Sequence, residues 1–200
     1  MDMKRPPDLF ELRLDCLWPM TKHFEKKISR LRAPIIVTAR APREGGANNL
    51  SKKQRIDLLL RFSPYAEYVD VELSDLDALN TVLACARKRN VRRILSYHNF
   101  KSTPSSRSLR AKALLAKTRG ADVLKIATRT DTPAALARLV DFMTNNDVDL
   151  PVSAMGIGEL GAISRLLLAR CGSALNYAAL GRPTVEGQLS MELLRSALGR

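Results

Sequence analysis

Residues 104–139, PSSRSLRAKALLAKTRGADVLKIATRTDTPAALARL, contain the alternation of elements that decides the fold. Ser105–Arg119 follows a proline and reads as a helix, and Gly120 provides a natural end for it. The short apolar run Val123–Ala127 then has the composition of a buried strand. Thr132, which precedes a proline, is a good N-cap for the next helix. This stretch therefore predicts a helix, a strand and a second helix in succession.

The same alternation continues along the whole chain. Short apolar, β-branched runs alternate with longer segments of helical period, such as Leu76–Arg89, which has apolar residues on one stripe. The predicted strands are Leu9–Leu14, Ile35–Ala39, Tyr68–Leu73, Arg93–Tyr97, Val123–Ala127, Val152–Met155 and Ala174–Ala178.

Strands that alternate with helices imply a parallel sheet, and both an open doubly wound sheet and a closed barrel have this order. The glycine-rich turn of dinucleotide-binding sheets is absent from the sequence. Polar residues stand at predicted strand ends, where a barrel gathers its active site. We therefore predict an α/β fold, a TIM-type (β/α) barrel formed by one domain over residues 1–200. Seven strand–helix units can be counted in the sequence and a complete barrel has eight, so one unit is expected to be missing.

The composition is that of a globular protein, with 46% hydrophobic and 26% charged residues. No apolar run approaches the length of a membrane span, and Met1–Pro7 does not begin a signal peptide. Cys16, Cys85 and Cys171 are scattered and lack metal-ligand spacing, so we expect reduced thiols in a cytoplasmic protein.

The net charge of +13 is high, and basic residues cluster in 87–93 and 107–119. Such a surface can bind nucleic acid. However, no aromatic residues that could stack on bases are interleaved with these clusters. We therefore favour solvated helix faces, expect no nucleic-acid partner, and note that a basic surface also attracts small anions.

Two predicted strands carry residues suited to covalent and acid–base chemistry. Lys125 is flanked by apolar strand residues, and poor solvation there would favour the neutral, nucleophilic amine. The alternative is a lysine that reaches water from an edge strand. His98 stands at the end of another apolar strand and is a candidate general acid–base, although a structural histidine has the same pattern.

Further charged residues follow or interrupt other predicted strands. Glu11 and Arg13 are two residues apart and share one strand face. Arg40 leaves a strand end, and Glu44 follows in a loop where its carboxylate could orient a neighbouring imidazole or be simply solvated. Arg165, on a predicted helix, has the bidentate geometry that binds carboxylates.

Nine short motifs follow one another along nearly the whole chain. They are ELRLD (11–15), TARAPREGG (38–46), YVDVEL (68–73), SYHNF (96–100), LKIA (124–127), SAMGIG (153–158), ISR (163–165), GSALNY (172–177) and GQLS (187–190). In this order they resemble the type I 3-dehydroquinate dehydratases, the lysine Schiff-base enzymes of the shikimate pathway. Each motif alone is weakly specific, whereas nine in order are very specific.

The resemblance implies a hydro-lyase that converts 3-dehydroquinate into 3-dehydroshikimate and water without a metal or an organic cofactor. It implies that Lys125 condenses with the C3 ketone of the substrate. It also implies that His98 removes a C2 proton and helps to expel the C1 hydroxyl, and that Glu44 pairs with His98.

The resemblance further implies residues that hold the substrate's hydroxyls, carboxylate and ring. They are Glu11, Arg13 and Arg40 for the hydroxyls, Arg165 for the carboxylate, Thr184 and Gln188 on a loop that closes over the ligand, and Met155 and Tyr177 as apolar walls.

The chain departs from the family pattern in three places. A strand–helix unit with a substrate-contacting serine precedes the ELRLD strand in the family and is expected to be missing, which would leave an open edge that favours a homodimer or weak activity. Asn99 stands for an aspartate, and Thr184 for a serine. A catalytically weakened scaffold protein is an alternative function. A Schiff-base aldolase, which shares Lys125 but does not need Arg165 and Gln188, is another.

Overall fold

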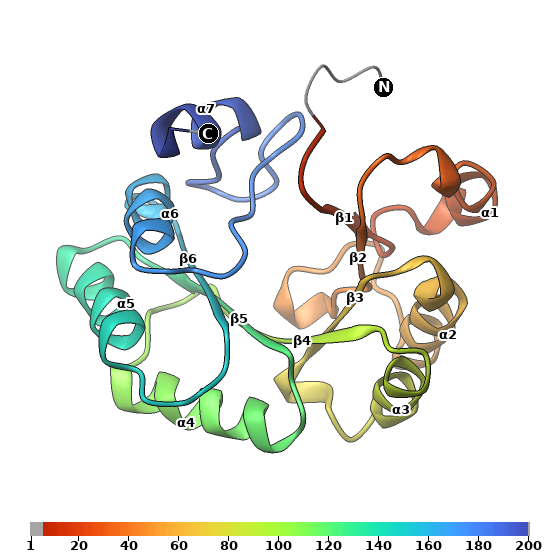
Figure 1. Ribbon diagram of the computed structural model, residues 1–200, viewed down its shortest axis with the longest axis horizontal. Helices are drawn as coiled ribbons and strands as arrows, with labels where there is room; N and C mark the ends of the chain where they lie inside the picture. Colours follow the sequence, from red (N-terminus) through yellow and green to blue (C-terminus); the bar gives the residue numbers. More distant parts are fainter. Residues whose placement is uncertain (1–5, 200) are drawn as a thin grey trace. The chain divides into compact units, whose positions relative to one another are not determined.

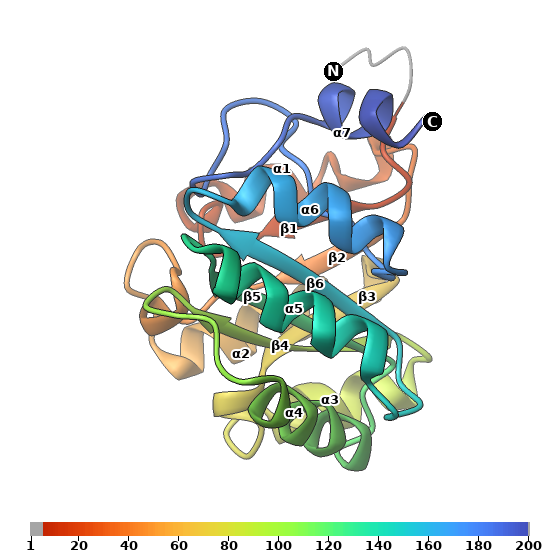
Figure 2. The same cartoon turned by 90° about the vertical axis from the view of Figure 1, so that its left-hand side faces the viewer.

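The computed structural model of the chain describes residues 6–199 (Figures 1 and 2). It consists of two compact units, Met1–Leu95 and Ser96–Arg200, which are called the first and second unit below. Both are built from parallel strands followed by helices, an α/β arrangement consistent with a TIM-like fold.

Three parallel strands form the centre of the first unit. They are β1 (Phe10–Arg13), β2 (Ile35–Thr38) and β3 (Tyr68–Glu72), which lie side by side in chain order. Arg13 is opposite Thr38, and Thr38 is opposite Asp70, so the polar ends of the three strands are adjacent. β4 (Arg92–Asn99) begins beside β3, where the Arg92 amide donates to the Glu67 carbonyl at 2.9 Å, and carries the chain into the second unit.

The helices of the first unit are α1 (Thr21–Glu25), α2 (Lys52–Phe62) and α3 (Asn80–Lys88). Ser51 begins α2 with a capping box, because its hydroxyl accepts from the Gln54 amide while the Gln54 side chain accepts from the Ser51 amide. The apolar side of α2 is buried, with Leu59 and Phe62 fully enclosed. Figure 1 shows α2 and α3 next to each other.

The second unit pairs β5 (Val123–Arg129) with β6 (Val152–Ile157) in parallel. Its helices are α4 (Ser106–Thr118), α5 (Pro133–Asn145), α6 (Gly161–Arg170) and α7 (Met191–Leu198). Successive helices contact one another, and α5 and α6 both pack on β6, as Figure 2 shows. The predicted helix boundaries around β5 are confirmed: Thr132 caps α5 through the Ala135 amide, and Gly120 ends the turn after α4 with a φ of 76°.

Two sequence predictions about elements are wrong. Ala174–Ala178 is not a strand, so the described residues contain six strands rather than seven. The segment runs beside β6, where the Ala174 amide donates to Val152, but the hydroxyl of Ser153 then donates to the Leu175 carbonyl at 2.5 Å. The Ala154 amide also donates to the Ser173 hydroxyl at 3.1 Å, so side-chain hydrogen bonds stand where a backbone ladder would continue.

The helix predicted from Leu76 begins only at Asn80. A 3-10 turn, Leu73–Asp75, follows β3 because the Asp75 carboxylate is drawn into a buried cluster with Arg55 and Arg43. The total number of strand–helix units in the fold, and the loss of a first unit, remain predictions. Among residues 6–199, no helix has both the length and the apolar character needed to cross a membrane.

The buried Arg55 side chain should contribute strongly to stability. It is 1% exposed and donates to Ala39, Asp75 and Glu72. Glu72 also pairs with Arg40, and Asp75 with Arg43, so Arg55→Ala removes one of the two arginines that neutralise each buried carboxylate. It should lower the free energy of unfolding by about 3–5 kcal/mol, measured by urea denaturation. The control Arg61→Ala removes the more exposed ion pair with Glu25 and should cost less than about 1 kcal/mol. Equal losses for the two variants would contradict the prediction.

Candidate active site

The Arg40 side chain leaves the end of β2 and is buried, with 2% of its surface exposed. Its Nη2 donates to Asp70 at 2.8 Å and its Nη1 to Glu72 at 3.2 Å. Burial lowers the pKa of the guanidinium, but the two carboxylates outweigh burial and raise it above its usual value. Arg40 is therefore a fixed cation. Sequence reasoning missed Asp70 and Glu72, although both lie on a predicted strand at alternate positions.

Asp15, a third residue that sequence reasoning missed, organises the end of β1. Its carboxylate accepts from Arg13 Nε at 3.0 Å and Nη2 at 2.7 Å, and also from the amides of Arg40 at 3.1 Å and Ala47 at 2.9 Å. Burial raises the pKa of Asp15, but Arg13 and the two amides outweigh it, so the pKa lies below its usual range. One buried carboxylate thus fixes Arg13 and both ends of the 40–47 loop.

Glu11 lies on the same strand as Arg13, and the predicted shared face is consistent with their contacts. The Thr38 hydroxyl donates to Glu11 Oε1 at 2.9 Å, while Arg13 reaches across to the Gly45 carbonyl at 3.1 Å. Glu11 is close enough to Arg40 to raise its pKa. The first unit therefore brings Glu11, Arg13 and Arg40 together at the ends of β1 and β2.

Glu44 ends the 3-10 helix Pro42–Glu44 and is buried, so it is not the solvated loop charge of the alternative interpretation. Its Oε1 accepts from the Ser74 hydroxyl at 2.6 Å. Gly45 adopts a left-handed conformation with a φ of 82°, and a side chain at Gly46 would come within 2.1 Å of the Arg40 carbonyl oxygen. The glycine pair therefore permits the tight loop that holds Glu44.

In the second unit, Lys125 lies in the middle of β5, where it is 4% exposed. Its Nζ is 3.8 Å from the centroid of the Tyr177 ring. The neighbouring apolar cluster includes Ala127 and Met155. The alternative of a lysine that reaches water from an edge strand is therefore wrong.

His98 is the penultimate residue of β4 and is half-buried. Its ring is parallel to that of Phe100, with centroids 6.4 Å apart. Asn99 closes the turn that follows, because its Oδ1 accepts from the Lys101 and Ser102 amides, and its Nδ2 donates to Tyr97 Oη. Asparagine provides the acceptor oxygen that this turn requires, as the aspartate of the family pattern would.

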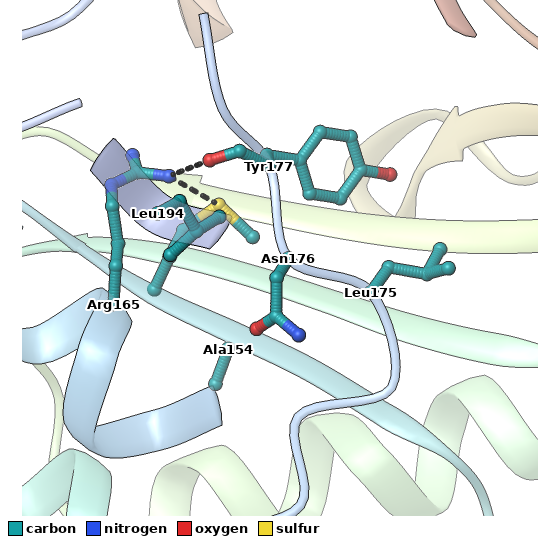
Figure 3. A pocket seen from close by; sticks show the side chains of 7 residues that line it. Ala154, Arg165, Leu175, Asn176, Tyr177 and Leu194 are labelled. Atoms are coloured by element: carbon teal, nitrogen blue, oxygen red, sulfur yellow. Dashed lines mark hydrogen bonds between the residues drawn. The ribbon is translucent and has the colours of Figure 1, made fainter. Parts of the chain in front are cut away.

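Arg165, on α6, is buried at one side of a small pocket shown in Figure 3. The pocket is lined by Ala154, Met155, Arg165, Leu175, Asn176, Tyr177 and Leu194. Arg165 Nη1 donates to the Tyr177 carbonyl at 2.9 Å and lies 3.6 Å from the Met155 sulfur. Its Nε has no hydrogen-bond partner, and within residues 6–199 no carboxylate pairs with it. Burial alone lowers its pKa to about 10.

Thr184 and Gln188 lie on the loop between α6 and α7 and are joined to each other. Gln188 Oε1 accepts from the Thr184 amide at 2.9 Å and from its hydroxyl at 3.1 Å. Between them, Glu186 pairs at 2.9 Å with Arg129, the last residue of β5. The Gly158 amide donates to the Glu186 carbonyl at 3.2 Å. The loop is therefore attached to the carboxyl ends of β5 and β6.

The predicted residues thus fall into two groups. Glu11, Arg13, Arg40 and Glu44 are in the first unit, while His98, Lys125, Met155, Arg165, Tyr177, Thr184 and Gln188 are in the second. Within 6–199, no three histidine, cysteine or acidic side chains are grouped as metal ligands. The pairing of Glu44 with His98 remains a prediction.

Comparison with known proteins adds a family assignment to this geometry. The profile of the family described as type I 3-dehydroquinase matches residues 2–199. The 3-dehydroquinate dehydratase of Methanothermobacter thermautotrophicus is 34% identical over 194 residues, 96% of this chain and 84% of the relative. That of Shouchella clausii is 35% identical, over 97% of this chain and 81% of the relative.

Solved structures are similar over the same extent. The type I 3-dehydroquinate dehydratase of Clostridium difficile, with covalently modified comenic acid, has a TM-score of 0.88 and 27% identity, and the match covers 98% of this chain and 82% of the other. The 3-dehydroquinate dehydratase of Geobacillus kaustophilus also has a TM-score of 0.88, at 27% identity, over 96% and 80% of the two chains.

The buried guanidinium of Arg165 should lower the free energy of unfolding of the unliganded protein. Burial lowers its pKa to about 10 on folding, so the cost is fully present below pH 10 and diminishes as the pH rises above that value. Arg165→Met should therefore raise the free energy of unfolding at pH 7 by about 1–3 kcal/mol, measured by urea denaturation. The control Arg170→Met, at an exposed position of the same helix, should change it by less than about 0.5 kcal/mol. A destabilised Arg165→Met would mean that the two contacts of Nη1 outweigh the desolvation cost.

Proposed function

Since the chain belongs to the type I 3-dehydroquinase family, we propose that it converts 3-dehydroquinate into 3-dehydroshikimate and water in the shikimate pathway, through an imine on Lys125. The observation that carries this proposal is the burial of Lys125 on β5 against the Tyr177 ring. A lysine in such a place is suited to condense with a ketone, because little water competes for its amine.

Lys125 supplies the electron sink of the reaction. Its amine adds to the C3 carbonyl, and loss of water from the adduct leaves an iminium. The iminium withdraws electrons from C2, so the C2–H becomes acidic and the hydroxyl at C1 can then be expelled by β-elimination. Hydrolysis of the product imine returns the free amine of Lys125.

His98 transfers the protons. As a general base it takes the C2 proton, and as a general acid it then protonates the departing C1 hydroxyl, so that one imidazole serves both halves of the elimination. Glu44 pairs with this imidazole and sets its orientation. Its buried position in the tight 42–46 turn supports that role, since a fixed carboxylate can orient a ring more closely than a solvated one.

The polar end of the first unit binds the ring hydroxyls. Arg13 and Arg40 are donors and Glu11 is an acceptor, which together match hydroxyl groups that both donate and accept. Their fixed ion pairs with Asp15, Asp70 and Glu72 support this role, because pre-ordered side chains lose little entropy when a ligand binds.

Arg165 binds the substrate's carboxylate. It is a buried cation without an acidic partner in the described part of the chain, and an incoming carboxylate would offset its desolvation. Thr184 and Gln188 close over this carboxylate from their loop, and Met155 and Tyr177 form the apolar walls beside Lys125.

Borohydride trapping tests the covalent step. With 3-dehydroquinate present, reduction should add one ligand mass to the peptide that contains Lys125 and abolish turnover. Lys125→Ala should lose both the label and the activity, because the imine cannot form. Lys117→Ala, which changes an exposed lysine of α4, should keep both. Labelling that persists unchanged in Lys125→Ala would disprove the assignment.

His98→Ala should separate binding from elimination. We expect kcat to fall by roughly 10²–10⁴-fold, the usual contribution of a general acid–base, while borohydride still traps substrate on Lys125. Steady-state kinetics and intact-protein mass spectrometry measure the two effects. The exposed His23 provides the control, since His23→Ala should stay within about twofold of the parent kcat. A kcat within a few-fold of the parent in His98→Ala would make His98 a structural residue.

A further inference from the structure

A chain of hydrogen bonds connects Glu44 to the surface of the first unit. Ser74, in the 3-10 turn after β3, donates to Glu44 Oε1 at 2.6 Å and lies 2.9 Å from Arg43 Nη2. Ser74 is exposed, whereas Glu44 is buried. Neither Ser74 nor Arg43 belongs to the groups proposed to bind the substrate.

The donor and the acceptor in each of these hydrogen bonds follow from the chemistry of the side chains. A guanidinium only donates hydrogen bonds, so the Ser74 oxygen must accept from Arg43. The single hydroxyl proton of Ser74 is then available for Glu44, and 2.6 Å is the distance typical of a hydroxyl that donates to a carboxylate. The cation thus polarises the hydroxyl toward Glu44.

The far end of the chain is anchored in the core. Arg43 Nη2 also donates to Asp75 at 2.5 Å, and the buried Asp75 receives a second bond from Arg55 at 2.6 Å. Burial raises the pKa of Asp75, but Arg55 and Arg43 outweigh it and keep the pKa below its usual range. Asp75 therefore remains an anion that holds Arg43 beside Ser74.

We propose that Ser74 is a positioning residue. Through the hydrogen-bonded series Arg43–Ser74–Glu44 it fixes the Glu44 carboxylate in the orientation that proton transfer by the imidazole requires. This inference rests on the proposed function, in which Glu44 orients the catalytic imidazole. A glutamate has several rotatable bonds, and a bond to one carboxylate oxygen restricts both its rotamer and the plane of its carboxyl group. Ser74 acts on the reaction only through Glu44.

The test compares Ser74→Ala with Ser74→Thr. Loss of the hydroxyl should lower kcat about tenfold, the size expected for one hydrogen bond to a charged group, and leave KM within about twofold. Threonine keeps a hydroxyl at this exposed position and should restore kcat to within about twofold of the parent. Ser51→Ala is the matched control, because it removes the α2 cap and lowers Tm without changing kcat.

Two further variants test whether the hydrogen bonds among Arg43, Ser74 and Glu44 act together. In a Glu44→Gln background, Ser74→Ala should change kcat by less than about twofold, since the carboxylate on which Ser74 acts is gone. Arg43→Met frees the hydroxyl to rotate and should lower kcat by about two- to fivefold. Additive effects of Ser74→Ala and Glu44→Gln would overturn the proposal, as would an unchanged kcat in Ser74→Ala.

A crystal structure of Ser74→Ala separates this inference from the proposed function, because it does not depend on turnover. The Glu44 carboxyl should adopt a different rotamer or more than one, and an unmoved Glu44 would overturn the positioning role. Failure of the proposed function would instead appear in the parent protein, as absent turnover and absent trapping on Lys125.

Discussion

Pairing of buried charge is the constraint on which the ends of the first three strands depend. Arg40 and Arg55 are almost fully enclosed, and each is surrounded by carboxylates from β3 or the turn after it. Removal of one partner would leave an uncompensated ion in the protein interior, which costs far more than loss of a surface pair. The ion pairs therefore hold the strand ends together. They also restrict the motion of the side chains proposed to bind the substrate's hydroxyls in this unit.

In the second unit, the buried arginine Arg165 has no carboxylate partner within the described residues. Arg165 is buried, and its hydrogen-bond partners within the described chain are a backbone carbonyl and a sulfur, whereas Lys125 lies against an aromatic ring. A buried guanidinium such as that of Arg165 is costly until an anion reaches it. Stability is therefore lower where a ligand is expected to bind, a trade that functional sites commonly make. The two units thus provide a rigid polar surface and an incompletely neutralised pocket, in keeping with hydroxyl and carboxylate recognition respectively.

The sequence predicted what depends on local pattern: the parallel α/β class, the extent of α4, the N-cap of α5 and the apolar setting of Lys125. It did not predict Asp15 or Ser74 as organising residues, because their partners lie about thirty residues away and become neighbours only through strand order. The supposed seventh strand failed for a related reason. Its composition fits a strand, but the Ala154 amide of β6 donates to the Ser173 hydroxyl instead of to a backbone carbonyl of the segment. Composition predicts that a segment is extended, whereas competing side-chain hydrogen bonds, here of Ser153 and Ser173, decide whether it pairs as a strand.

The Thr184 substitution illustrates how a departure from a family pattern can preserve its chemistry. Gln188 Oε1 accepts two bonds from Thr184, one from the backbone and one from the hydroxyl, so the side-chain amide has a defined orientation. With its oxygen held inside the loop, the group that remains to meet a ligand is the amide nitrogen, which only donates. A donor suits a carboxylate and would repel another cation. Since serine and threonine share the hydroxyl that sets this orientation, either residue gives the loop the same polarity toward an acid, and the extra methyl group is accommodated because position 184 is exposed.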